Sequence, residues 1–163
     1  MYEDATVYRL KMNVDYAVER LLGSFKDAEF KPCSKHQESS CGFVPVKKGS
    51  YLAANKNRAL FRAKLERKVL SPDVFRQRVI EAVEDHKDLT GERLTKQQIK
   101  QLKAEIKQGL LPRAPKITQV IEAYIDTDKG CLVVKSLDKK INKLFLQLFN
   151  RTVDNAIDFT VAA

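Results

Sequence analysis

Residues 59–69 alternate apolar and charged side chains, and this alternation constrains the fold more than any other part of the sequence. Successive side chains of a β-strand point to opposite faces, so the pattern predicts a long amphipathic strand with one buried face. The apolar face holds Phe61, Ala63, Leu65 and Val69, and the charged face holds Arg62, Lys64, Glu66 and Lys68. A solvated sheet surface explains such a charged face, but its excess of positive charge also fits contact with a polyanion.

Two helices are expected directly after this strand. Ser71-Pro72-Asp73 is typical of a helix start, because serine accepts a hydrogen bond from an early amide and proline has no amide to leave unpaired. Gly91 is expected to end this helix and Thr95 to cap the next. The sequence therefore predicts a helical hairpin over about residues 72–112, with apolar stripes that pack against each other.

Four lysines form a row along the second of these helices. Lys96, Lys100, Lys103 and Lys107 are spaced so that they fall within about 60° of one another at 100° per residue. One interpretation is that the lysine stems cover the apolar stripe while the ammonium groups reach water. The other is a row of charge that follows a phosphate backbone. The spacing alone leaves both open.

The remaining periodicities predict an α+β fold. Strands are expected over residues 6–12, within 31–50, near 51–54, over 117–125 and 131–134, and over 153–161, with helices over 14–25 and 137–149. Residues 126–130 carry the signals of a turn between two of these strands. We therefore expect an antiparallel or mixed sheet packed with helices, in a single domain over 1–163 that carries the helical hairpin 72–112 as an inserted subdomain.

Charge and hydropathy limit the function classes. With 44% hydrophobic and 31% charged residues, the chain is an ordinary globular sequence and not a disordered one. No apolar run reaches the roughly 20 residues that span a bilayer, and no signal-peptide pattern is present, so we expect a cytoplasmic protein without a membrane partner. The formal net charge of +9, most of it within residues 1–70, favours nucleic acid as the partner.

The three cysteines are expected to be reduced thiols. Cys33, His36 and Cys41, with Cys131 or His86 as a fourth ligand, could form a zinc site, but the usual Cys-x2-Cys pairs are absent. We therefore predict no metal and no cofactor.

Several segments together resemble the RdgC family of recombination-associated DNA-binding proteins over roughly residues 6–150. The matching segments are Val7-Tyr8-Arg9-Leu10, Phe30-Lys31-Pro32-Cys33, Gly42-Phe43-Val44-Pro45, the run from Glu66 to Val74, Leu110-Leu111-Pro112-Arg113-Ala114, and Tyr124-Ile125-Asp126-Thr127. The resemblance implies an α+β protein that binds duplex DNA with little sequence preference, forms a ring-shaped homodimer around the duplex and restrains RecA-driven strand exchange. It also implies a nucleoid-associated location.

Two departures from the family pattern limit what can be carried over. Family members continue past the last residue of this chain, as expected if it is a short, phage-type form, and Pro115 stands where they place an aromatic residue. The family has also carried an exonuclease label. Asp126 and Asp128 flank a turn and the acids of residues 81–92 belong to an exposed helix, so we expect no enzyme activity.

These observations lead to two hypotheses of function. The first is a DNA-binding protein that occupies duplex DNA without sequence preference and thereby modulates recombination. The second is a protein-binding inhibitor of RecA or of a host nuclease, with little DNA binding. The predicted DNA-binding residues are Arg58, Arg62, Lys64, Lys68, Arg93, Lys96, Lys100, Lys103, Lys107 and Arg113.

Overall fold

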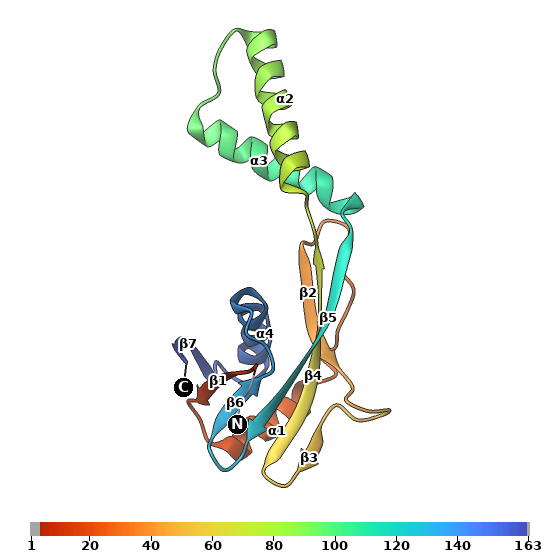
Figure 1. The fold of residues 1–163 in the computed structure, drawn as a ribbon, viewed down its shortest axis with the longest axis vertical. Helices are drawn as coiled ribbons and strands as arrows, with labels where there is room; N and C mark the ends of the chain where they lie inside the picture. Colours follow the sequence, from red (N-terminus) through yellow and green to blue (C-terminus); the bar gives the residue numbers. More distant parts are fainter. Residues whose placement is uncertain (1–3, 163) are drawn as a thin grey trace. The chain divides into compact units, whose positions relative to one another are not determined.

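A computed structural model describes residues 4–162 of the chain, with side chains up to Ile157 (Figure 1). The helices are α1 (Val14–Ser24), α2 (Pro72–Thr90), α3 (Lys96–Leu110) and α4 (Lys139–Thr152), with a short 3-10 helix, η1 (Leu111–Arg113). The strands are β1 (Thr6–Leu10), β2 (Ser39–Val44), β3 (Ala53–Asn55), β4 (Arg58–Lys68), β5 (Lys116–Asp126), β6 (Cys131–Val134) and β7 (Ile157–Ala162). The α+β class is confirmed.

The strands form a seven-stranded sheet in the order β2-β4-β5-β6-β1-β7, and β3 pairs with β4. The pairs β1–β6, β1–β7, β3–β4 and β5–β6 are antiparallel. The predicted hairpin around residues 126–130 is confirmed, because Asp126 pairs with Cys131 across the turn. In chain order, α2 and α3 lie between β4 and β5, as the sequence predicts for an inserted hairpin.

The chain divides into two compact units. The sheet unit contains the residues up to Pro32, Ser40–Glu66 and the residues from Thr118 onward. The hairpin unit contains Cys33–Ser39 and Arg67–Ile117. The hairpin unit is therefore larger than the predicted segment 72–112, because it includes a loop that precedes β2.

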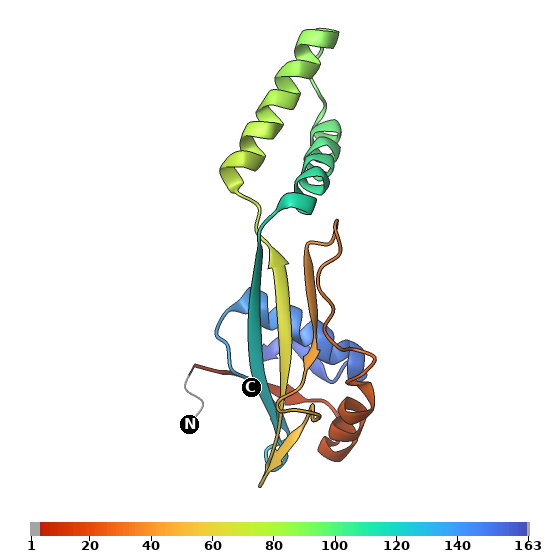
Figure 2. The same cartoon turned by 90° about the vertical axis from the view of Figure 1, so that its right-hand side faces the viewer.

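Helices α1 and α4 cover one face of the sheet unit (Figure 2). The centre of the core beneath them is Phe61 of β4, which is 1% exposed. Its ring stacks on Phe145 at 5.9 Å and on Phe149 at 6.0 Å between ring centroids, and meets Phe43 edge-on at 5.9 Å. The buried face predicted from residues 59–69 is thus confirmed for this strand within the sheet unit.

Local signals in the sequence account for the helix ends. The side chains of Asn13, Ser71, Thr95 and Asp138 accept hydrogen bonds from the first amides of α1, α2, α3 and α4 in turn. Gly91 ends α2 in the left-handed conformation, with φ of 70°. Helix α2 ends at Thr90, directly before Gly91, as the sequence predicts.

Some apolar residues of the predicted strands and helices are exposed. Leu137 is 63% exposed because it precedes the cap of α4 instead of starting the helix. Val69 and Ile117 are 39% and 43% exposed, respectively, and both belong to the hairpin unit, outside the buried core cluster of the sheet unit. The apolar pattern therefore extends beyond the part of each strand that is buried.

The hairpin unit has no fully buried residue in either long helix. The two helices contact each other along half-buried apolar positions. These include Phe75, Val79 and Val83 of α2 and Ile99, Leu102 and Ile106 of α3. The predicted packing of the two apolar stripes is confirmed, with a thin core.

Candidate nucleic-acid interface

The second face of the sheet unit carries a small apolar patch surrounded by basic side chains. Tyr124, Cys131 and Val133 are buried in this patch, with Val7 and Leu60 packed beside them. The described residues of this cluster include none from α1 or α4. We call the five cations Arg9, Arg58, Arg62, Lys64 and Lys135 the basic sheet face.

Strand alternation places these cations together. Arg58, Arg62 and Lys64 lie in β4 on the side opposite the buried Phe61. Arg9 of β1 pairs directly with Cys131, a residue of the apolar patch. Lys135 follows β6 and its amide donates to the carbonyl of Glu122 at 2.9 Å, so the β5–β6 ladder continues to this residue. The sheet register, more than any single segment, creates this basic surface.

Aromatic rings hold two of the cations in place. The guanidinium of Arg58 lies 4.6 Å from the ring centroid of Tyr124. The ammonium of Lys64 lies 5.0 Å from the ring centroid of Phe30. Both geometries lie within the range of a cation–π contact. Each cation is therefore oriented while its charge remains available to a ligand.

A carboxylate binds two more of these cations. Arg62 and Lys135 contact Glu122 at 3.2 Å and 3.3 Å between nitrogen and oxygen. Their side chains remain 40% and 49% exposed, and that of Glu122 is 45% exposed. Solvent, and hence a dissolved anion, reaches all three charged groups.

Lys68 is not part of an exposed basic surface, so this part of the predicted charged face is wrong. It is 8% exposed, and its ammonium donates hydrogen bonds to the carbonyls of Ser34 at 2.8 Å and Lys35 at 2.5 Å. Its own amide donates to the carbonyl of Glu38 at 2.9 Å. The loop 33–39 covers the end of β4, which alternation within the strand cannot reveal. Glu66 of the same face is also 8% exposed.

The hairpin unit carries a separate set of cations. Lys96, Lys100 and Lys103 are exposed along α3, and Arg93 is exposed before it. Lys107 differs, because its ammonium contacts a carboxylate oxygen of Glu38 at 2.9 Å. The predicted row of four lysines is therefore three exposed lysines and one ion-paired lysine.

A hollow of about 690 Å³ lies within the hairpin unit between α2, α3 and the loop 33–39. Its charged lining is mixed: Lys35, Arg78 and Arg113 are basic, and Glu81 and Asp85 are acidic. The exposed Arg113 thus borders this hollow, at the base of the hairpin.

The acidic residues near the β5–β6 turn stabilise that turn. The carboxylate of Asp126 is 3% exposed and accepts hydrogen bonds from the amides of Asp128 and Lys129 at 3.1 Å and 3.0 Å. Among the described residues, no group of three or more His, Cys, Asp or Glu side chains is placed to hold a metal ion.

Cys41 is half-buried, and burial raises the pKa of its thiol to about 11.

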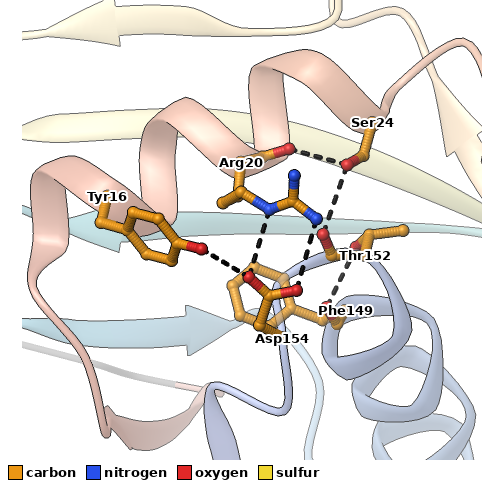
Figure 3. Close-up of polar contacts among 6 residues, drawn as sticks. All are labelled: Tyr16, Arg20, Ser24, Phe149, Thr152 and Asp154. Carbon is orange, nitrogen blue, oxygen red and sulfur yellow. Dashed lines mark hydrogen bonds and ion pairs between the residues drawn. The ribbon is translucent and has the colours of Figure 1, made fainter.

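A second polar cluster joins α1 to the segment after α4 (Figure 3). The Tyr16 hydroxyl donates to a carboxylate oxygen of Asp154 at 2.7 Å, and Arg20 contacts the same carboxylate at 3.2 Å. The hydrogen bond from Tyr16 and the charge of Arg20 hold the pKa of Asp154 below its ordinary value. The same hydrogen bond raises the pKa of Tyr16. This cluster therefore connects α1 to the segment that follows α4.

The comparisons with known proteins give one family. A family model described as "Putative exonuclease, RdgC" matches residues 1–161. This chain belongs to the RdgC family. The RdgC resemblance of the separate segments is thereby confirmed over nearly the whole chain.

The relatives include recombination-associated proteins RdgC from three genera. That of Haemophilus influenzae strain PittGG is 25% identical over 155 residues, covering 93% of this chain and 51% of the relative. That of Psychromonas ingrahamii is 29% identical over the same coverage, and that of Shewanella oneidensis is 34% identical over 69% of this chain and 38% of the relative. The chain spans about half the length of the first two of these curated relatives.

Sequence reasoning missed Arg9 and Lys135 as members of the basic sheet face. The alternation of β1 and β6 already places both opposite the buried core, but each strand is too short for its alternation alone to identify a basic face.

Pro115, the position at which the chain departs from the RdgC pattern, accepts a hydrogen bond at its carbonyl from the Val69 amide at 2.8 Å and so joins the two ends of the hairpin. Within the described residues, no helix has the length and apolar character to cross a bilayer.

Proposed function

We propose that this RdgC-family protein binds duplex DNA through its phosphates, without sequence preference, and thereby restrains RecA-type strand exchange. The observation that carries the proposal is the basic sheet face, in which five cations stand against one exposed acid, Glu122, while the neighbouring Glu66 and Asp126 are buried. Side chains that contact phosphates position a protein on DNA without reading its sequence. The names of the relatives, which are recombination-associated, agree with this role.

The exposed cations of the hairpin unit extend the proposal. Lys96, Lys100 and Lys103, with Arg93 and Arg113, provide a second set of phosphate contacts. A homodimer would present two basic sheet faces to one duplex, since a two-fold axis duplicates every surface. Binding in this mode is non-enzymatic and places the protein at the nucleoid in the cytoplasm.

A salt titration tests the phosphate contacts. Fluorescence anisotropy with two labelled duplexes of unrelated sequence should give equal affinities, and the logarithm of the binding constant should fall linearly with the logarithm of salt. Each phosphate contact contributes about 0.9 to the slope. Arg58→Gln and Lys64→Gln should each reduce the slope by roughly one. A flat salt response, or a strong preference for one sequence, would contradict the proposal.

The lysines of α3 need a separate comparison. Lys100→Glu with Lys103→Glu should weaken duplex binding if these side chains contact phosphates. Unchanged binding would mean that they only solvate the helix. Light scattering at the working concentration tests the dimer, and a monomer that binds DNA normally would remove that part of the proposal.

The mixed lining of the hairpin hollow favours a second candidate. Basic Arg78 and Arg113 stand beside acidic Glu81 and Asp85, a pattern that suits a folded protein better than a polyanion. Under this candidate the protein binds RecA or a nuclease directly. Strand-exchange and exonuclease assays with DNA in large excess separate the two, because inhibition by occupied DNA disappears and inhibition by a protein contact persists.

A further inference from the structure

The basic sheet face contains a hollow whose lining includes a carboxylate of the chain itself. The hollow has a volume of about 200 Å³ and is lined by Lys47, Arg62, Lys135 and Glu122, among others. These four side chains come from separate segments: the loop after β2, β4, the residue after β6, and β5. Three cations and one anion therefore line the same hollow.

The contacts of Glu122 are those that a phosphate would make. Its Oε1 lies 3.2 Å from a terminal nitrogen of Arg62, and its Oε2 lies 3.3 Å from Nζ of Lys135. Carboxylate and phosphate oxygens bind guanidinium and ammonium groups with the same charge-assisted geometry. Each of the three side chains is at least 40% exposed, so the ion pairs are weak and open to exchange with a dissolved anion.

We infer that Glu122 is an internal counter-ion that competes with a phosphate group for Arg62 and Lys135. The inference rests on the proposed function, since it names a control within the same basic sheet face. When a phosphate binds, the two ion pairs of Glu122 break and its carboxylate becomes hydrated. Glu122 therefore lowers the affinity of this subsite for phosphate, because a phosphate must displace the carboxylate before it can contact Arg62 and Lys135.

Lys47 gives the hollow the charge to bind a phosphate after this exchange. Its side chain is exposed and lines the same hollow as Arg62 and Lys135. A single carboxylate leaves two positive charges of the three uncompensated. Each phosphodiester of DNA carries one negative charge, so two neighbouring phosphates of a strand compensate more of them than Glu122 does.

The test compares two variants that remove the same charge. Glu122→Gln removes the competing carboxylate, and Glu19→Gln removes an exposed carboxylate of α1, the helix that covers the other face. We expect Glu122→Gln to tighten duplex binding roughly three- to tenfold at about 0.1 M salt, the range set by two exposed ion pairs. Glu19→Gln should change it less than about twofold, because charges more than a Debye length apart are screened.

Three further measurements make the result specific. Adding Arg62→Gln and Lys135→Gln to Glu122→Gln should abolish the gain, because both released cations are then absent. The salt slope of Glu122→Gln should exceed that of the unchanged protein by up to about 1.8, the value for two added phosphate contacts. Glu122→Thr, which suits a strand, serves as a second neutral variant if Glu122→Gln folds poorly by circular dichroism.

Titration with tripolyphosphate, followed by the NMR signal of the Arg62 side chain, separates this inference from the proposed function. Tighter tripolyphosphate binding in Glu122→Gln without any duplex binding would keep the counter-ion role and reject the DNA proposal. Equal effects of Glu122→Gln and Glu19→Gln on both ligands would overturn the inference.

Discussion

Replacing Lys68 by methionine tests whether this residue is structural, as its contacts indicate, or a phosphate ligand, as the charge pattern of residues 59–69 suggests. Methionine keeps most of the apolar stem and removes the ammonium, which donates to the carbonyls of Ser34 and Lys35. A hydrogen bond to a charged group contributes about 1.5–3 kcal/mol to stability. The two carbonyls belong to exposed residues, so water replaces part of the loss.

We therefore expect Lys68→Met to lower the free energy of unfolding by about 1.5–3 kcal/mol, the value of one such hydrogen bond. Urea unfolding monitored by circular dichroism measures this change. Exchange of the Lys68 amide, which donates to the carbonyl of Glu38, should accelerate about ten- to hundredfold as the loop 33–39 detaches. Duplex affinity at low salt should remain within about twofold, since a buried ammonium makes no phosphate contact.

Lys64→Met is the matched control, because it makes the same change four residues earlier in β4, on the same face of the strand. Its ammonium contacts only the ring of Phe30 among the interactions described above, so the stability loss should stay near 0.5–1 kcal/mol. Its duplex affinity and salt slope should both fall. If Lys68→Met leaves stability unchanged and weakens DNA binding as Lys64→Met does, the structural role of Lys68 is refuted.

Three other predictions concern the sheet unit. Phe61→Ala should cost about 3–5 kcal/mol in urea unfolding, because it empties the centre of the aromatic core. Gly42→Ala should also destabilise the fold, since the added Cβ would lie 2.5 Å from the backbone nitrogen of Phe30, and a normal melting temperature would contradict this. The pKa of Asp154 is lowered, so its contribution is present at neutral pH and is lost as pH falls through that pKa. Asp154→Asn should therefore flatten the acid side of the stability profile, and Tyr16→Phe should do so in part.

Local signals predicted much of the secondary structure, because each helix-capping side chain accepts a hydrogen bond from an amide only a few residues away. Ser71 and Thr95 bond to residues three positions away, so the hairpin could be predicted from its own sequence. Lys68 could not be placed in the same way. Its partners Ser34 and Lys35 lie more than thirty positions earlier, and only closure of the loop over β4 brings them together.

The residues of the candidate site also fall into those predicted from local sequence and those brought in by strand pairing. Arg58, Arg62 and Lys64 share one strand, and its alternation identifies their common face. Arg9 and Lys135 join them only through the pairing of β1 with β6 and of β6 with β5. The ion pair of Glu122 with Lys135 follows from the pairing of β6 with β5, and that with Arg62 follows from the position of β4 beside β5. A residue that competes with the ligand therefore has no signature in the linear sequence.

The hydrogen bond between Val69 and Pro115 has a consequence for how RdgC-type chains can diversify. It closes the hairpin insert at its base, where the chain leaves β4 and returns to β5. Any segment whose ends are about 4.8 Å apart, the spacing of paired strands, can be joined at these two positions while the strands keep their register. An engineered chain can therefore replace residues 70–114 with a two-residue turn and keep the strands of the sheet unit in register, with loss of the ion pair between Lys107 and Glu38.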